Sequence, residues 1–130
     1  MLGNLTYNKI KEGELKKMKK IEAIIRPDVF ADVRRALALE GIDGLSVTEI
    51  AGCGRQEGRT GLFRGNVYEM EFSAKLKLEM IVDDHLVEPI VDAILEYAAT
   101  GEVGDGKIFI LPVDEAIRIR TKERGVVAVY

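Results

Sequence analysis

The sequence predicts an α+β fold in which two β-α-β halves build one antiparallel sheet, with both helices on the same face of that sheet. Apolar and polar residues alternate near residues 20–25 and again near residues 75–80, as they do in half-buried strands. A segment with the helical spacing of apolar residues follows each of these two strands. A further short apolar segment follows each helix, so the order strand-helix-strand occurs twice.

The first half begins at Lys20, where the alternation predicts a strand that ends before Pro27. Asp28 is the expected N-cap of the helix that follows. Gly41 is expected to end this helix, because glycine is common just past a helix C-terminus. One face of the helix would carry four apolar residues, which are Phe30, Val33, Ala36 and Leu37. Residues 45–50 then predict a second strand.

Regular patterning fades between about residues 52 and 74. Glycines interrupt any helix or strand there, at Gly52, Gly54, Gly58, Gly61 and Gly65. Three arginines make the same segment basic, namely Arg55, Arg59 and Arg64. We therefore expect a long loop, and loops of this length are usually functional or mobile.

The second half repeats the pattern, with a third strand at residues 75–80 and a fourth at residues 108–111. Asp83 or Asp84 would cap the helix between them. Pro89 falls later than the first helical turn in this interpretation and costs a hydrogen bond, so a distorted helix start is expected. The arrangement is ferredoxin-like, and one small chain leaves the second face of its sheet bare. Homo-oligomerisation is the simplest way to cover that face.

Composition narrows the classes of function. The chain has 130 residues, which fits one domain, and a formal net charge of −3, which gives no reason to expect a nucleic-acid partner. The single cysteine, Cys53, excludes an intrachain disulfide and suits a reducing compartment. No apolar run reaches membrane-spanning length and the N-terminus lacks an apolar signal core, so we expect a cytoplasmic protein without membrane insertion.

Residues 1–17 differ from the rest, because they are polar and lysine-rich. We interpret them as an N-terminal extension that forms either a charged helix from Lys9 to Lys20 or a loose tail. Residues 18–130 would then form the single domain.

A glycine-spaced run at residues 101–107 carries the clearest chemistry. Glycines allow backbone N–H groups to turn toward an anion, and Lys107 adds a mobile positive charge. Residues 117–121 predict a short fifth strand, in which Arg118 and Arg120 would face the same side and reach one ligand. Together these features predict a site for several phosphates. The alternative is an ordinary glycine turn with solvated arginines.

The spacing G-x-x-x-x-G-K from Gly101 to Lys107 matches most of a P-loop, but two features differ. Ile108 occupies the position of the magnesium-binding Ser or Thr, and the residues that follow predict a strand rather than a helix. We therefore expect nucleotide binding without the fold of a P-loop NTPase.

Five segments, in this order and spacing, resemble the PII nitrogen-signalling proteins over about residues 18–121. The segments are residues 18–27, residues 54–58, Arg64-Gly65 with Tyr68, residues 100–109 and residues 117–121. Members of that family are trimers whose clefts between subunits bind ATP or ADP, and 2-oxoglutarate binds there together with MgATP. Their long T-loop docks onto a membrane transporter, such as an ammonium channel, or onto a metabolic enzyme. The resemblance thus implies a homotrimeric, non-enzymatic sensor of nitrogen metabolism, with its T-loop at about residues 52–74.

The resemblance also assigns roles to individual residues. The phosphates would be held by Arg55, Lys107, Arg118 and Arg120, with Gly104, Asp105 and Gly106. The adenosine would lie near Ser46, Glu79 and Ile81. Magnesium would be bound by Gln56, and 2-oxoglutarate by Gln56, Gly58 and Lys75. Tyr68 corresponds to a tyrosine that is modified in some members, and Arg64 corresponds to a residue at the T-loop tip that contacts the partner.

The T-loop segment departs from the family pattern. Glu57 stands where a basic residue is usual, and Ser73-Ala74 replaces the Leu-Pro that often ends the loop. These differences indicate a divergent paralogue with its own target. Glu57 also adds negative charge near the expected 2-oxoglutarate site, which would weaken that ligand.

Two other classes of function fit less well. An ATP-hydrolysing or phosphoryl-transferring enzyme needs a base or a water-orienting group, and no His, Asp or Glu in the phosphate motifs stands out as one. An RNA-binding ferredoxin-like module needs exposed aromatic residues on its sheet for stacking, which the sequence does not indicate.

Overall fold

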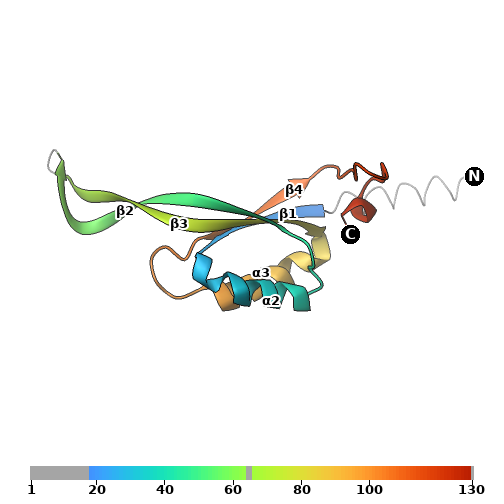
Figure 1. Ribbon diagram of the computed structural model, residues 1–130, viewed down its shortest axis with the longest axis horizontal. Helices are drawn as coiled ribbons and strands as arrows, with labels where there is room; N and C mark the ends of the chain where they lie inside the picture. The colour runs from blue at the N-terminus through green and yellow to red at the C-terminus, as the bar shows by residue number, and fades with distance from the viewer. Residues whose placement is uncertain (1–17, 64–65, 130) are drawn as a thin grey trace, which may run out of the picture.

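The computed structural model describes residues 18–63 and 66–129, and for residues 53–71 within these ranges it describes the backbone only (Figure 1). The elements in chain order are β1 (Met18–Ile25), the 3-10 helix η1 (Pro27–Val29), α2 (Phe30–Leu39), β2 (Ser46–Phe63), β3 (Asn66–Asp83), η2 (Asp84–Leu86), α3 (Val87–Ala98), β4 (Lys107–Val113) and η3 (Val126–Ala128).

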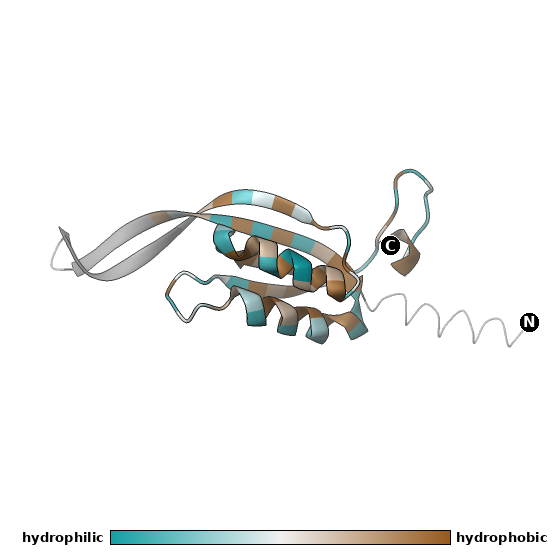
Figure 2. Ribbon diagram, turned by 60° about the horizontal axis from the view of Figure 1, so that its bottom comes forward, coloured by the Kyte–Doolittle hydropathy of each residue, from teal (hydrophilic) through white to brown (hydrophobic). Residues whose placement is uncertain are grey.

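The strands form one antiparallel sheet in the order β2-β3-β1-β4, and α2 and α3 cover one of its faces (Figure 1). Residues paired across strands share a face, so Ile21 of β1 lies on the helix-covered side with Met80 of β3. Apolar and polar residues alternate along the strands accordingly (Figure 2). The buried core includes Ile21, Ala23, Ile25, Leu78, Met80 and Val82 from the sheet and Val33, Leu37, Ile90 and Ile94 from the helices. The predicted ferredoxin-like fold is confirmed.

Helix α2 ends as the sequence predicts. Gly41 has φ +88°, its N–H donates to the carbonyl of Ala38 at 3.0 Å, and the N–H of Ile42 donates to the carbonyl of Leu37 at 2.9 Å. This pair of bonds satisfies carbonyls that the last helical turn leaves without partners. Glycine adopts the required left-handed backbone without steric cost.

The predicted helix N-caps are wrong. The side chains of Asp28, Asp83 and Asp84 make no cap hydrogen bond, because each helix continues from a 3-10 turn whose backbone supplies the acceptors. The N–H of Phe30 bonds to the carbonyl of Pro27, and Val87 bonds in the same way to Asp84. Pro89 is the third residue of α3 and so lies in the first turn, where a missing N–H costs no helical bond.

The segment predicted as a long loop is instead a two-stranded ribbon. β2 and β3 stay paired out to Phe63 and Asn66, with one irregularity after Glu57. β1 pairs with β3 only as far as Leu76, so the outer part of the ribbon projects beyond the body of the domain (Figure 1). The glycines predicted a loop because glycine has a low strand propensity. That propensity is a weak effect, and the hydrogen bonds between β2 and β3 outweigh it because they satisfy the backbone of both strands.

The predicted fifth strand at residues 117–121 is also wrong. An isolated bridge between Ile117 and Arg124 closes a short turn, within which the N–H of Arg118 donates to the carbonyl of Glu123 at 2.9 Å. Lys122 has φ +65°, which lies outside the extended region. Isoleucine and arginine alternate here as in a strand, but in the described ranges this segment has no strand partner beyond the one bridge.

Candidate functional site

The glycine-spaced loop between α3 and β4, residues 99–106, is organised around the carboxylate of Asp105. Oδ2 accepts hydrogen bonds from the backbone N–H of Thr100 at 2.7 Å and of Gly101 at 2.9 Å. Oδ1 accepts from the Thr100 hydroxyl and from Nε of Arg26 at 3.0 Å. These bonds, above all that from the Thr100 hydroxyl, hold the pKa of Asp105 far below its usual range. Both oxygens of Asp105 are thus turned into the loop.

Asp105 makes the stability of the loop depend on pH. Because its pKa is lowered in the folded state, its contribution is present above the ordinary Asp pKa of about 3.9 and is lost as the pH falls toward the folded value. Below about pH 4, we expect the free energy of unfolding to fall more steeply with decreasing pH in the wild type than in Asp105→Asn. Urea titrations at a series of pH values measure this. Parallel pH curves for the two proteins would contradict it.

Two glycines of the loop meet the sheet closely. Gly106 has φ +104°, and a Cβ added there would lie 1.7 Å from the carbonyl oxygen of Ile24 in β1. Gly104 has φ +102°, and a Cβ added there would lie 3.2 Å from Nη2 of Arg26 and 3.3 Å from Nζ of Lys75. The glycine spacing therefore brings the loop backbone against the strand and leaves it facing two cations.

Arg26 and Lys75 both donate to carbonyls of this loop. Nη2 of Arg26 bonds to the carbonyl of Val103 at 2.7 Å, and Nζ of Lys75 bonds to the carbonyl of Gly104. Lys107 begins β4 directly after the loop and pairs with Ile24. The loop therefore lies beside three cationic residues, Arg26, Lys75 and Lys107, and two of them bond to its carbonyls.

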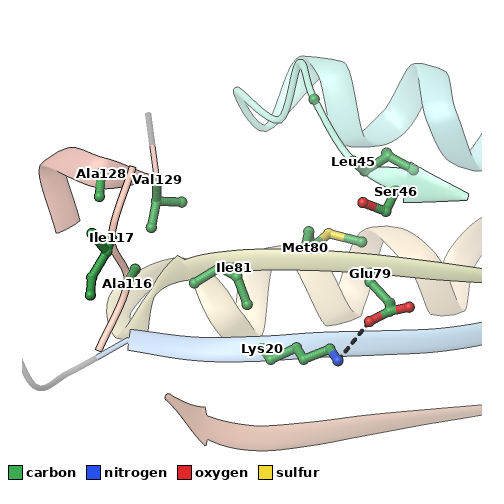
Figure 3. A pocket seen from close by; sticks show the side chains of 11 residues that line it. Lys20, Leu45, Ser46, Glu79, Met80, Ile81, Ala116, Ile117, Ala128 and Val129 are labelled. Carbon is green, nitrogen blue, oxygen red and sulfur yellow. Dashed lines mark ion pairs between the residues drawn. The ribbon is translucent and has the colours of Figure 1, made fainter. Parts of the chain in front are cut away.

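A pocket of about 590 Å³ lies at the other end of the sheet, where β1 begins. It is lined by Lys20, Gly44, Leu45, Ser46, Glu79, Met80, Ile81, Ala116, Ile117, Ala128 and Val129. The three residues predicted to lie near an adenosine, Ser46, Glu79 and Ile81, are thus brought together (Figure 3).

Glu79 enters this pocket as a charged group. Its Oε2 lies 2.6 Å from Nζ of Lys20, and its Oε1 lies 3.7 Å from Nζ of Lys77. The hydrogen bond from Lys20 lowers the pKa of Glu79, and the same bond raises the pKa of Lys20. Glu79 therefore offers the pocket an ionised acceptor at neutral pH.

Arg118 and Arg120 do not form the predicted pair of parallel forks. Arg118 is half-buried, with Nη1 2.8 Å from Oε1 of Glu123 and Nη2 3.0 Å from the carbonyl of Val127. Arg120 is exposed within the turn that begins after Arg118. Because this segment is a turn and not a strand, residues two apart do not share a face.

The predicted phosphate ligands lie at opposite ends of the sheet. Lys107 begins β4 and Arg118 follows its far end, and the seven residues of β4 span roughly 20 Å. The glycine loop and the turn at residues 117–124 accordingly lie at the two ends of the domain (Figure 1). Within one chain, a compact phosphate group cannot contact both.

The sequence is similar to known regulatory proteins over nearly all of this domain. A family model described as nitrogen regulatory protein P-II matches residues 18–123. The P-II protein of Nostoc punctiforme is 54% identical over 112 residues, which are 86% of this chain and 100% of that protein. The chain belongs to the P-II family. P-II 1 of Escherichia coli is 51% identical over the same length and coverage. P-II proteins are regulators rather than enzymes, as predicted.

Solved structures of P-II proteins share the fold. GlnK of Bacillus subtilis superposes with a TM-score of 0.74 at 34% identity, over 85% of this chain and 97% of that one. A complex of the same protein with ATP gives 0.73 at 31% identity, over 85% and 94%. Arabidopsis thaliana PII bound to citrate gives 0.71 at 42% identity, over 87% and 92%.

None of the helices in the described ranges is long and apolar enough to cross a membrane.

The remaining P-II residues that the sequence pointed to lie on the ribbon. Arg55, Gln56 and Gly58 belong to β2 and Tyr68 to β3, where Glu57 pairs with Tyr68. Arg64 and residues 1–17 lie outside the described residues.

Sequence reasoning gave no role to Arg26, which contacts the glycine loop through two hydrogen bonds. Its position at the end of β1, just before Pro27, gives no local signal of that contact, because the loop lies 77–79 residues later in the chain.

Proposed function

We propose that this P-II chain is a homotrimeric sensor that binds ATP or ADP between adjoining copies. The observation that carries the proposal is the separation of the predicted nucleotide ligands into two groups at opposite ends of the sheet. The pocket with Ser46 and Glu79 would receive the nucleoside, and the glycine loop of a neighbouring copy, with Lys107, would receive the phosphates. The ATP complex of Bacillus subtilis GlnK supports the choice of ligand.

The uncovered face of the sheet supports assembly. Phe109 and Leu111 lie on that face and are 46% and 40% exposed in the single chain. Beside them, Lys20, Glu22, Lys77 and Glu79 form a ring of ion pairs with distances of 2.6–3.7 Å. Because the charges of the ring balance, copies can pack on this face without burying a net charge. Apolar side chains around the ring supply the hydrophobic contribution to assembly.

We further propose that 2-oxoglutarate binds beside the phosphates with magnesium. Lys75 and the glycine loop lie together. Gln56 lies six residues farther out along β2 than Ile50, the partner of Lys75, so the ribbon would have to bend back toward the loop for Gln56 to reach the same ligand. Among the described residues no group of three His, Cys, Asp or Glu side chains could hold a metal, which fits a magnesium ion that is ligated mainly by nucleotide phosphates and Gln56. Magnesium would offset the repulsion between the dicarboxylate and the triphosphate.

The ribbon is the element that would report the ligand state. Arg55 and Gln56 lie part-way along it, paired with Met70 and Glu69, and its outer part extends away from the body of the domain (Figure 1). Occupation of the site at its base would change the posture of the outer part, which we propose to be the T-loop that docks onto a transporter or a metabolic enzyme. Tyr68 would be its modification site and Arg64 a partner contact. The setting we propose is the cytoplasm.

Calorimetry together with light scattering tests this function. The chain should elute as a trimer and bind one ATP per subunit, and 2-oxoglutarate should release heat only after MgATP has been added. GTP serves as the control nucleotide. A monomer in solution that binds neither ATP nor ADP would overturn the proposal.

A further inference from the structure

Lys20 and Glu79 are the only charged residues among the described residues that line the pocket at the start of β1. Their side chains point toward each other, as the dashed line in Figure 3 marks. Nζ of Lys20 lies 2.6 Å from Oε2 of Glu79, so the contact is a charge-assisted hydrogen bond. This bond lowers the pKa of Glu79 and raises the pKa of Lys20, and both groups are therefore ionised at neutral pH.

The register of the sheet places Lys20 where it can hold Glu79. Glu22 of β1 pairs directly with Glu79 of β3, and Lys20 lies two residues before Glu22 on the same face. Lys20 is therefore the diagonal neighbour of Glu79 across the two strands, within reach of a long side chain. Two carboxylates directly opposite each other repel, and Lys20 offsets that repulsion because it contacts Glu22 at 3.7 Å as well as Glu79.

Lys77 is a second cation within reach of the same carboxylate. Its Nζ lies 3.7 Å from Oε1 of Glu79 and 3.7 Å from Oε1 of Glu22. The side chains of Lys20 and Lys77 are equally exposed, at 31% each. Lys77 is not among the described residues that line the pocket. The two oxygens of Glu79 are thus divided between a lysine inside the pocket and a lysine outside it.

We propose that Lys20 is a positioning residue of the nucleotide site, which holds the Glu79 carboxylate in the pocket against the attraction of Lys77. Glu79 then accepts a hydrogen bond from a donor group of the nucleoside. An acceptor that is already fixed before the ligand arrives loses less conformational freedom on binding, so the ligand binds more tightly. The inference rests on the proposed nucleotide function and adds a residue to which the family resemblance gave no role.

Lys20→Gln and Lys77→Gln make a matched pair, because each removes one charge from the same ring of ion pairs and from an equally exposed side chain. Glutamine is shorter than lysine and uncharged, so it cannot hold Glu79 in the same place. We expect Lys20→Gln to weaken ATP and ADP by the same factor, about tenfold, because both nucleotides share the nucleoside. Lys77→Gln should change both affinities by no more than about twofold. Lys20→Arg keeps a charged donor and should restore binding.

A double-mutant cycle separates this positioning role from a direct contact between Lys20 and the ligand. If Lys20 acts through Glu79, Lys20→Gln should cost no further affinity in a chain that already carries Glu79→Gln. If Lys20 contacts the phosphates itself, the loss should persist in that background and should be larger for ATP than for ADP, because ATP carries more negative charge. That result would overturn the positioning role.

Calorimetric titration of each full-length variant gives the affinities, and light scattering checks that the trimer is retained. If Lys20→Gln does not assemble, Lys20→Met and Lys77→Met replace the pair, because an apolar side chain suits a face that packs against other copies. Equal affinities of the wild type and the Lys20 variant, or equal losses in the Lys20 and Lys77 variants, would overturn the positioning role while the nucleotide function stands. If the wild type binds no nucleotide, both proposals are overturned together.

Discussion

Trimers that combine Lys107→Ala chains with Arg120→Ala chains should regain one ATP site of wild-type affinity. Lys107→Ala and Arg120→Ala each remove a charged hydrogen-bonding partner, so each should weaken ATP by about 2–3 kcal/mol in a uniform trimer. If the ligands of one site come from adjoining copies, any trimer that contains both variants has one seam with an intact Lys107 facing an intact Arg120. Arg120 is preferred to Arg118 because the latter also holds Glu123 and Val127.

The two variants can be coexpressed with different affinity tags and purified over both tags in sequence. Titration should then show one site of wild-type affinity for every three subunits. Trimers that combine two differently tagged Lys107→Ala chains serve as the control and should show none. Mixed trimers that bind ATP no better than either parent would mean that each site lies within a single chain, which would contradict the shared cleft.

The sequence predicted those elements whose signal is local. β1 alternates and α2 repeats with the period of its own secondary structure, and burial against a single core preserves that period. Gly41 was predictable because a helix end with φ +88° requires a residue type that tolerates it. The helix starts were not predictable in the same way, since backbone carbonyls of a 3-10 turn do the work expected of an aspartate side chain.

The ribbon and the turn at residues 117–124 show where local signals fail. β2 and β3 are held beyond the sheet by pairing with each other, and no pattern within either strand announces that pairing. Ile117 to Thr121 alternates like a strand, yet strand identity depends on a neighbour. For the site, the glycine spacing and Lys107 could be recognised from the sequence as features typical of anion binding. Their separation from Arg118 by the length of β4, and the contact of Arg26 with Asp105, follow from topology alone.

Gly106→Ala should be the most damaging single-methyl change in the glycine loop. The added Cβ would lie 1.7 Å from the carbonyl oxygen of Ile24, at a backbone φ of +104°. The backbone of Ile24 cannot move away, because β1 is a central strand. Ile24 pairs with Lys77 of β3 on one side and with Lys107 of β4 on the other. The loop must therefore move, and we expect the free energy of unfolding to fall by about 3 kcal/mol or more. Urea denaturation measures this loss.

Gly101→Ala is the matched control, because Gly101 has φ +86° but no atom lies within 4 Å of an added Cβ. It should lose only the cost of the left-handed backbone, about 1 kcal/mol. The two variants should also differ in ATP affinity. Displacement of Gly106 shifts the backbone beside Lys107 and disturbs the carbonyls that Arg26 and Lys75 hold, so the phosphate half of the site should fail with the loop. Equal losses of stability in both variants would show that the approach to Ile24 does not fix the loop. In that case the glycines would be needed only for their positive φ angles and not for the close approach of the loop to β1. The proposed anion site would then depend on the cationic side chains alone.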